Sequence, residues 1–139
     1  MPYNLLYQFY KFIIMKKNKE INNTLSPLAY EVTQQAGTEK PFSGKYYDFF
    51  DKGTYHCVCC GNKLFNSESK FKSSSGWPSF FRAESKSLEY ISDNSFGMKR
   101  IEVRCKKCRA HMGHVFDDGP MPTQKRYCIN SVAMNFKKK

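Results

Sequence analysis

The sequence predicts a mainly β protein of one domain, built from short antiparallel strands, with one or two short N-terminal helices. Three observations predict this class. The chain has 139 residues, which suits a single hydrophobic core. From residue 54 onward, short β-branched and aromatic runs alternate with turn-forming residues. Four of its six cysteines form two Cys-x-x-Cys pairs, which predict a metal-bound clip between strands.

The first 24 residues are predicted to be a flexible extension. Residues 3–15 are apolar and aromatic, but this run is too short to span a bilayer. No basic residues precede it and no small-residue cleavage site follows it, so a signal peptide fits poorly. We expect residues 1–14 to be an upstream extension or a mobile arm, ahead of a cytoplasmic protein start at Met15.

The first confident helix signal lies at Ser26 and Pro27. A serine cap followed by proline in the first helical position favours a helix start. We expect this helix to end at Gly37, because glycine commonly follows the last helical residue. An aromatic connection over residues 41–50 then leads to the strands.

The strands follow one another at short intervals. Residues 55–58 and 63–65 are predicted to pair through a turn at 60–62. Residues 88–92 and 97–104 are predicted to form a hairpin around Asp93 and Asn94. Residues 109–116 lead to a turn and a loop, and residues 126–136 are predicted to form one continuous last strand, because neither glycine nor proline interrupts them.

The last predicted strand carries a candidate nucleophile. Side chains alternate along a strand, so Arg126, Cys128 and Asn130 are expected to share one face. The nearby cation favours the thiolate of Cys128. The amide of Asn130 adds a donor and an acceptor. This arrangement suits a nucleophilic cysteine, although a small buried core thiol also fits the strand alone.

The paired cysteines predict a structural zinc site. Cys57 and Cys60 form one pair, and Cys105 and Cys108 form the other. Four thiolates make the closed tetrahedral site of structural zinc. The separation between the pairs exceeds that of a small zinc ribbon, so we predict one zinc ion clipping two distant hairpins together. The alternative is a set of redox pairs or disulfides.

The net charge of +11 raises the question of acidic partners. A basic balance can indicate nucleic acid. The lysines cluster near the termini, however, at residues 16–19 and in a predicted basic tail at residues 137–139. We therefore interpret them as solubilising residues and expect a monomer that binds neither nucleic acid nor membranes.

Further runs complete a specific pattern. Residues 75–80 read Ser-Gly-Trp-Pro-Ser-Phe and contain the single tryptophan, Trp77. Residues 110–116 contain His111 and His114, and an Asp-Asp-Gly-Pro turn follows at residues 117–120. Together with both cysteine pairs and the Arg-Tyr-Cys-Ile-Asn-Ser run at residues 126–131, they closely resemble the B-type methionine sulfoxide reductases. The resemblance covers residues 25–136 as one domain and implies two antiparallel sheets in a tent-like arrangement.

This resemblance implies a reaction and a role for each site residue. A thiolate attacks the electrophilic sulfur of methionine (R)-sulfoxide, in a protein or as the free amino acid, and becomes a sulfenic acid. The oxygen must gain a proton as its bond to sulfur breaks. The implied roles are nucleophile for Cys128, thiolate stabilisation for Arg126, acid or donor for His111 and His114, orientation of a histidine or water for Asp118, binding of a water or the oxide for Asn130, and contact with the S-methyl group for Trp77.

Two positions depart from the family pattern. Many relatives carry a resolving cysteine two residues before the tryptophan, where this chain has Ser75. Either an external thiol such as thioredoxin then reduces Cys128 directly, or Cys59, the spare thiol, takes the resolving role. Gln124 stands where the family usually has glycine, which leaves the shape of that loop open.

Two other functions remain compatible with parts of the pattern. A zinc-stabilised binding module for nucleic acid or protein would explain the charge and the zinc cysteines, but would leave the histidines and Cys128 without a role. A thiol redox sensor would use a reactive Cys128 without turnover of a sulfoxide. Salt-dependent binding of nucleic acid would favour the first of these alternatives.

Overall fold

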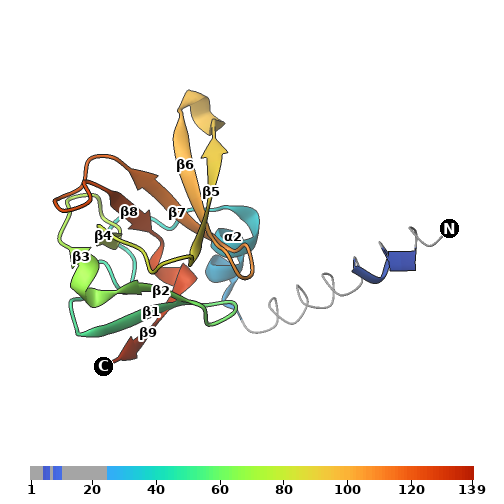
Figure 1. The fold of residues 1–139 in the computed structure, drawn as a ribbon, viewed down its shortest axis with the longest axis horizontal. Helices are drawn as coiled ribbons and strands as arrows, with labels where there is room; N and C mark the ends of the chain where they lie inside the picture. Colours follow the sequence, from blue (N-terminus) through green and yellow to red (C-terminus); the bar gives the residue numbers. More distant parts are fainter. Residues whose placement is uncertain (1–4, 7, 11–24) are drawn as a thin grey trace.

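The computed structural model describes residues 5–6, 8–10 and 25–139. The predicted extension over residues 1–24 therefore lies largely outside the described residues. The described chain forms two antiparallel sheets, ordered β2-β1-β9 and β3-β4-β8-β7-β6-β5 (Figure 1). This confirms the predicted mainly β class. The strands are β1 (Gly53–Cys57), β2 (Lys63–Asn66), β3 (Lys70–Phe71), β4 (Ser79–Phe80), β5 (Leu88–Asp93), β6 (Arg100–Cys105), β7 (His111–Phe116), β8 (Arg126–Ile129) and β9 (Met134–Lys138).

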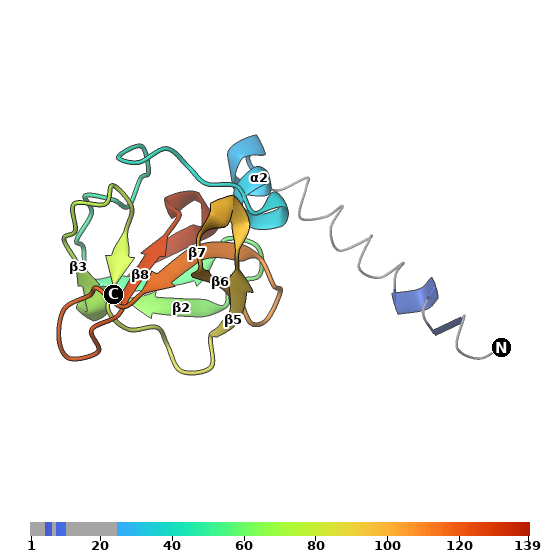
Figure 2. The ribbon, with the colours of Figure 1, turned by 90° about the horizontal axis from the view of Figure 1, so that it is seen from above.

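The predicted helix is α2 (Pro27–Gln35). The hydroxyl of Ser26 accepts a hydrogen bond from the backbone N–H of Ala29 at 3.1 Å, as a serine cap should. The helix ends at Ala36, which adopts a left-handed φ of 54°, one residue before the expected Gly37. Its buried face packs on β7 and on the short 3₁₀ helix η3 (Ser131–Ala133), so α2 lies at one side of the sheet that contains β7 (Figure 2).

Within residues 25–139 there are two further 3₁₀ turns, η1 (Ser67–Ser69) and η2 (Ser95–Gly97), and the described residues among 5–10 are also helical. Within the ranges that the structure describes, none of the helices has the length and apolarity needed to cross a bilayer.

The predicted hairpin is formed by β5 and β6, and it projects from the rest of the molecule (Figure 1). Asp93 pairs with Arg100 at its far end, and Glu102 pairs with His114 on β7. Because side chains alternate, Asp93, Arg100, Glu102 and His114 all lie on the same face of the sheet. This charged face is the one that meets the candidate site.

The predicted continuous strand over residues 126–136 is wrong. The chain leaves the six-stranded sheet after β8, turns through η3, and enters the three-stranded sheet as β9. The turn begins at Asn130, whose backbone N–H and side-chain Nδ2 both donate to the carbonyl of Met112, at 2.9 and 3.0 Å. Asparagine side chains that bond to backbone compete with strand pairing, which accounts for the break.

The three-stranded sheet also extends further than expected. Lys137 and Lys138 belong to β9 and pair with Thr54 and Gly53 of β1. Two of the three lysines assigned to a basic tail are therefore strand residues.

The core lies between the two sheets. Phe65 on β2 stacks on Phe80 on β4, with ring centroids 4.3 Å apart, and Tyr55 on β1 meets Phe80 edge-on at 5.1 Å. Along β8 the burial alternates, so Tyr127 and Ile129 face this core. Cys128 consequently points to the opposite face of the sheet.

Candidate active site

A pocket opens on the face of β8 that carries Cys128. Four of the predicted site residues meet in it: Trp77, His114, Cys128 and Asn130. Its other lining residues, which the sequence pattern did not predict, are Thr38, Arg100, Gly113 and Phe116. The pocket therefore combines a thiol, an imidazole and an indole within one opening.

The strand pairing explains why these residues meet. Cys128 lies opposite His114 on β7 and opposite Ser79 on β4. Ser79 directly follows the loop that carries Trp77. Gly113 permits the close approach of β7 and β8, because a Cβ there would lie 2.0 Å from the carbonyl oxygen of Cys128.

The thiol of Cys128 is partly buried. This burial raises the pKa of Cys128, while the Arg126 guanidinium and the Ser75 hydroxyl act in the opposite direction. Arg126 thus favours the thiolate as predicted, but burial outweighs it. The ionisation of Cys128 therefore depends on the balance between its burial and the nearby Arg126 guanidinium.

Arg126 and Asp118 form a pair beside the pocket. The guanidinium donates from Nε and Nη2 to the two carboxylate oxygens, at 2.8 and 3.1 Å, and lies 4.4 Å from the ring of Phe116. The Asp118 side chain is 65% exposed. Its carboxylate binds Arg126, while the two histidines contact Glu102 and Asp93; the orientation of a water by Asp118 stays a prediction.

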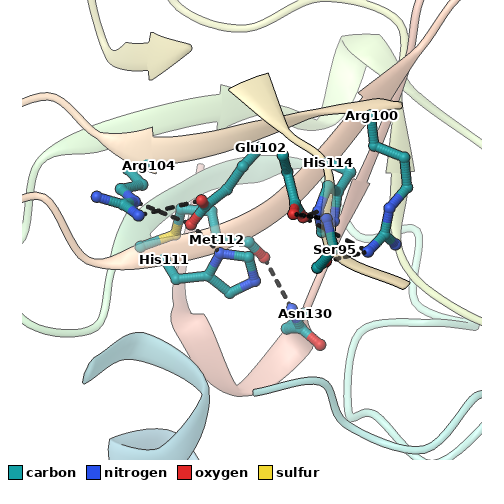
Figure 3. Close-up of polar contacts among 9 residues, drawn as sticks. Ser95, Arg100, Glu102, Arg104, His111, Met112, His114 and Asn130 are labelled. Atoms are coloured by element: carbon teal, nitrogen blue, oxygen red, sulfur yellow. Dashed lines mark hydrogen bonds and ion pairs between the residues drawn. The ribbon is translucent and has the colours of Figure 1, made fainter. Parts of the chain in front are cut away.

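The two histidines each face a different carboxylate (Figure 3). Nδ1 of His111 lies 2.6 Å from Oε2 of Glu102, which also accepts from Arg104 at 2.8 Å. His111 is buried, and this burial lowers its pKa in spite of the Glu102 charge. Only His114 of the pair lines the pocket, so the structure separates the two histidines that the sequence treated alike.

His114 is held from the hairpin. Its Nε2 lies 2.7 Å from Oδ2 of Asp93, and Arg100 lies 3.4 Å from the same oxygen. The sequence pattern predicts Asp93 only as part of the hairpin turn. The signal that could have found it is the register of the hairpin, which brings its end to the face of His114.

Glu39 connects Trp77 to the end of β8. Its carbonyl accepts from Nε1 of Trp77 at 3.1 Å, and its backbone N–H donates to Oδ1 of Asn130 at 3.0 Å. Its carboxylate accepts from the N–H of Val132 at 3.0 Å. Both ends of the Asn130 amide thus bond to backbone, and we interpret Asn130 first as a brace of the pocket wall.

The two departures from the family pattern have clear structural settings. The Ser75 hydroxyl accepts from the N–H of Trp77 at 3.3 Å and lies beside Cys128, so an oxygen stands where a second thiol would have reached the nucleophile. Gln124 has a left-handed φ of 61°, the conformation that glycine adopts most easily. Its carbonyl accepts from the N–H of Gly119 at 2.9 Å and closes the loop.

The four predicted zinc cysteines form one cluster. Their sulfur atoms all lie within 4.8 Å of one another. The Sγ atoms of Cys57 and Cys108 are 3.5 Å apart, and those of Cys60 and Cys105 are 3.6 Å apart. Zinc–sulfur bonds of about 2.3 Å place tetrahedral sulfurs about 3.8 Å apart, so the cluster fits a zinc ion.

The two cysteine turns share one backbone geometry. Gly61, with a φ of 80°, donates its N–H to the carbonyl of Cys57 at 2.8 Å. Arg109, with a φ of 66°, donates in the same way to Cys105 at 2.7 Å. One turn leaves β1 and the other leaves β6, so a shared ion would tie the two sheets together. Cys59 lies outside the set and contacts Gln34 of α2 at 3.5 Å.

Comparison with known proteins agrees with this site. The SelR domain matches residues 25–138. A peptide methionine sulfoxide reductase MsrB of Thioalkalivibrio sulfidiphilus is 55% identical over 86% of this chain and 88% of its own length. One from Methanosarcina barkeri is 50% identical over 89% and 88% of the two chains. The mitochondrial methionine-R-sulfoxide reductase B3 of Mus musculus is 50% identical over 88% of this chain, but over 49% of its own. The chain therefore belongs to the SelR-domain family of B-type methionine sulfoxide reductases.

Proposed function

We propose that this protein reduces methionine (R)-sulfoxide in oxidised proteins to methionine. The observation that carries the proposal is the pocket that combines Cys128, His114 and Trp77 in a chain about half identical to named reductases of this class. The rival function, a zinc-stabilised binding module, gives no reason for a thiol and an imidazole to share a pocket.

The reaction uses the sulfur of Cys128 as the oxygen acceptor. It attacks the sulfoxide sulfur and forms a bond to it. The oxygen then passes from the substrate sulfur to the sulfur of Cys128 as the original S–O bond and the bond between the two sulfurs break, which leaves a sulfenic acid and releases methionine. The proton that the thiol loses is the proton that the oxygen gains, so the step needs no further reactant. His114 handles this proton, and Arg126 stabilises the sulfur as its charge develops. The indole of Trp77 contacts the S-methyl group and selects the epimer. The four-cysteine site supplies stability when it holds zinc.

The direct test is the reduction of resolved methionine sulfoxide epimers. With dithiothreitol as reductant, we expect turnover of the R epimer and background rates with the S epimer, because the proposed contacts of the oxygen with His114 and of the S-methyl group with Trp77 require one configuration at sulfur. Peptides containing the sulfoxide serve as a second substrate. Turnover of the S epimer alone, or of neither, would contradict the proposal.

We further propose that an external thiol, with thioredoxin as the physiological candidate, reduces the sulfenic acid directly. Ser75 removes the thiol that relatives place beside the nucleophile. Two external thiols would return Cys128 to its thiol and release water and a disulfide. The proposed setting is a monomer in the cytoplasm, whereas the relative from Mus musculus is named as mitochondrial.

The substitution Cys59→Ser separates direct reduction from the use of a second cysteine. Cys59 contacts Gln34 and is not among the pocket residues, so we expect the variant to retain most of the thioredoxin-dependent rate. The measurement is turnover with thioredoxin beside turnover with dithiothreitol. A loss confined to the thioredoxin reaction would instead assign the resolving role to Cys59.

A further inference from the structure

Asp93 ends the edge strand β5, yet its carboxylate reaches the pocket histidine on β7. Its Oδ2 lies 2.7 Å from Nε2 of His114. The ladders explain this reach, because Asp93 pairs with Arg100 and Glu102 pairs with His114, all on one face of the sheet. The contact therefore depends on the hairpin keeping its register.

The other contacts of Asp93 identify it as an ionised acceptor. Its Oδ1 accepts from the backbone N–H of Ser95 at 3.0 Å, and Nη2 of Arg100 lies 3.4 Å from Oδ2. The hydrogen bond with His114, followed by those with Ser95, holds the pKa of Asp93 well below its usual range. An ionised carboxylate can only accept, so the hydrogen in the contact belongs to Nε2 of His114.

This assignment determines which ring nitrogen remains for chemistry. A neutral imidazole carries one hydrogen, so Nδ1 of His114 has a free lone pair. For the part of the chain that the structure describes, the hydrogen bonding of the His114 ring consists of its contact with Asp93. The ring lines the pocket and stands opposite Cys128 in the ladder of β7 and β8.

We infer that Asp93 is a positioning residue that holds His114 with its Nε2–H toward the hairpin and leaves Nδ1 to carry the proton of the reaction. The inference rests on the proposed function. Nδ1 accepts the proton of the Cys128 thiol and returns it to the sulfoxide oxygen as the S–O bond breaks. The imidazolium that exists between these steps is stabilised by the Asp93 charge. The sum is one thiol and one sulfoxide giving one sulfenic acid and one thioether.

Asp118 does not compete for this role, because its two oxygens accept from Arg126. Glu102 does not compete either, because it binds His111 and Arg104. Each acid on this side of the pocket thus has its own partner, and Asp93 is the one that contacts His114.

The test combines a tautomer measurement with kinetics on the full, zinc-loaded chain. Nitrogen-15 correlation spectra of the imidazole, assigned with a His114→Asn variant, should show the neutral ring protonated at Nε2. In Asp93→Asn, this preference should weaken, and kcat for the R sulfoxide should fall by about 10-fold to 100-fold with KM within about twofold, since a positioned proton carrier contributes about 10²-fold or more.

Asp117→Asn is the matched control. Asp117 undergoes the same change of charge and size, but its side chain is 85% exposed and pairs with Lys125. We expect unchanged His114 spectra and an unchanged kcat. The same result is expected for the spectra of Asp118→Asn.

Two results would overturn the inference: a wild-type His114 ring protonated at Nδ1, or an Asp93→Asn variant with the kcat of wild type. The wild-type spectrum tests the tautomer without any variant, so the inference stays falsifiable even if Asp93→Asn does not fold. The spectrum also needs no turnover. A wild-type chain that reduces neither sulfoxide would contradict the proposed function, whereas a proton on Nδ1 would contradict the role of Asp93.

Discussion

Replacing Cys128 with serine should reduce turnover of methionine (R)-sulfoxide to the background rate of the reductant. The hydroxyl is nearly the same size as the thiol, so the pocket and the ladder between β7 and β8 should remain intact. A serine oxygen, however, is a poor nucleophile toward sulfur. Because serine has no sulfur, it also cannot take up the sulfoxide oxygen as a sulfenic acid. The measurement is steady-state reduction of the R epimer with dithiothreitol, with the fold checked by thermal unfolding.

The control is Cys59→Ser, which makes the same chemical change at a thiol that does not line the pocket. Without any reductant, the wild-type chain should release one methionine per protein and retain a sulfenic acid that a cyclic 1,3-dione traps at Cys128. Ser75 explains why this acid should persist, because no neighbouring thiol is available at that position. A Cys128→Ser variant that keeps a tenth of the activity would rule out Cys128 as the nucleophile.

The pKa of Cys128 adds a pH dependence to the same experiment. Because burial raises this pKa, the fraction of free thiolate should grow only above the pH at which an ordinary thiol ionises. Alkylation of Cys128 by iodoacetamide should therefore rise with pH and reach its midpoint above that of a free thiol. The Cys128→Ser chain supplies the background from the other cysteines.

The features that depend on short-range pattern were predictable from sequence. The cysteine spacing predicted a four-sulfur cluster, and Ser26 with Pro27 predicted the start of α2. The hairpin of β5 and β6 also agrees with its turn residues. In each case, the residues that determine the feature lie near one another in sequence or repeat a known spacing.

The features that depend on pairing between distant segments were not predictable in this way. Asp93 and His114 are 21 residues apart and meet because two ladders place them on one face. Glu39 is 91 residues from Asn130, and its backbone hydrogen bond with that amide helps to end β8. The local pattern of residues 126–136 is that of a continuous strand. The break at Asn130 depends on hydrogen bonds with residues far away in the sequence, which a local pattern does not contain.

Removing zinc from the proposed four-cysteine site should strongly destabilise the domain. The site connects the end of β1 with the end of β6, so it ties together two sheets that otherwise meet through their core. Without the ion, four thiols would be crowded within 4.8 Å of one another. Domains of this kind have a net stability of about 5–15 kcal/mol, and metal removal can cost about 4 kcal/mol or more. We expect a strong chelator to lower Tm by more than about 10 °C.

The matched variants are Cys60→Ser, which removes a ligand, and Cys59→Ser, which removes the neighbouring thiol outside the cluster. Zinc content should fall and unfolding should move to lower temperature in the first variant only. Activity should be lost with it, because β6 ends at the ligand Cys105 and also carries Arg100, which lines the pocket. A chain that melts at the same temperature with and without chelator would show that the cluster does not hold the two sheets together through a metal.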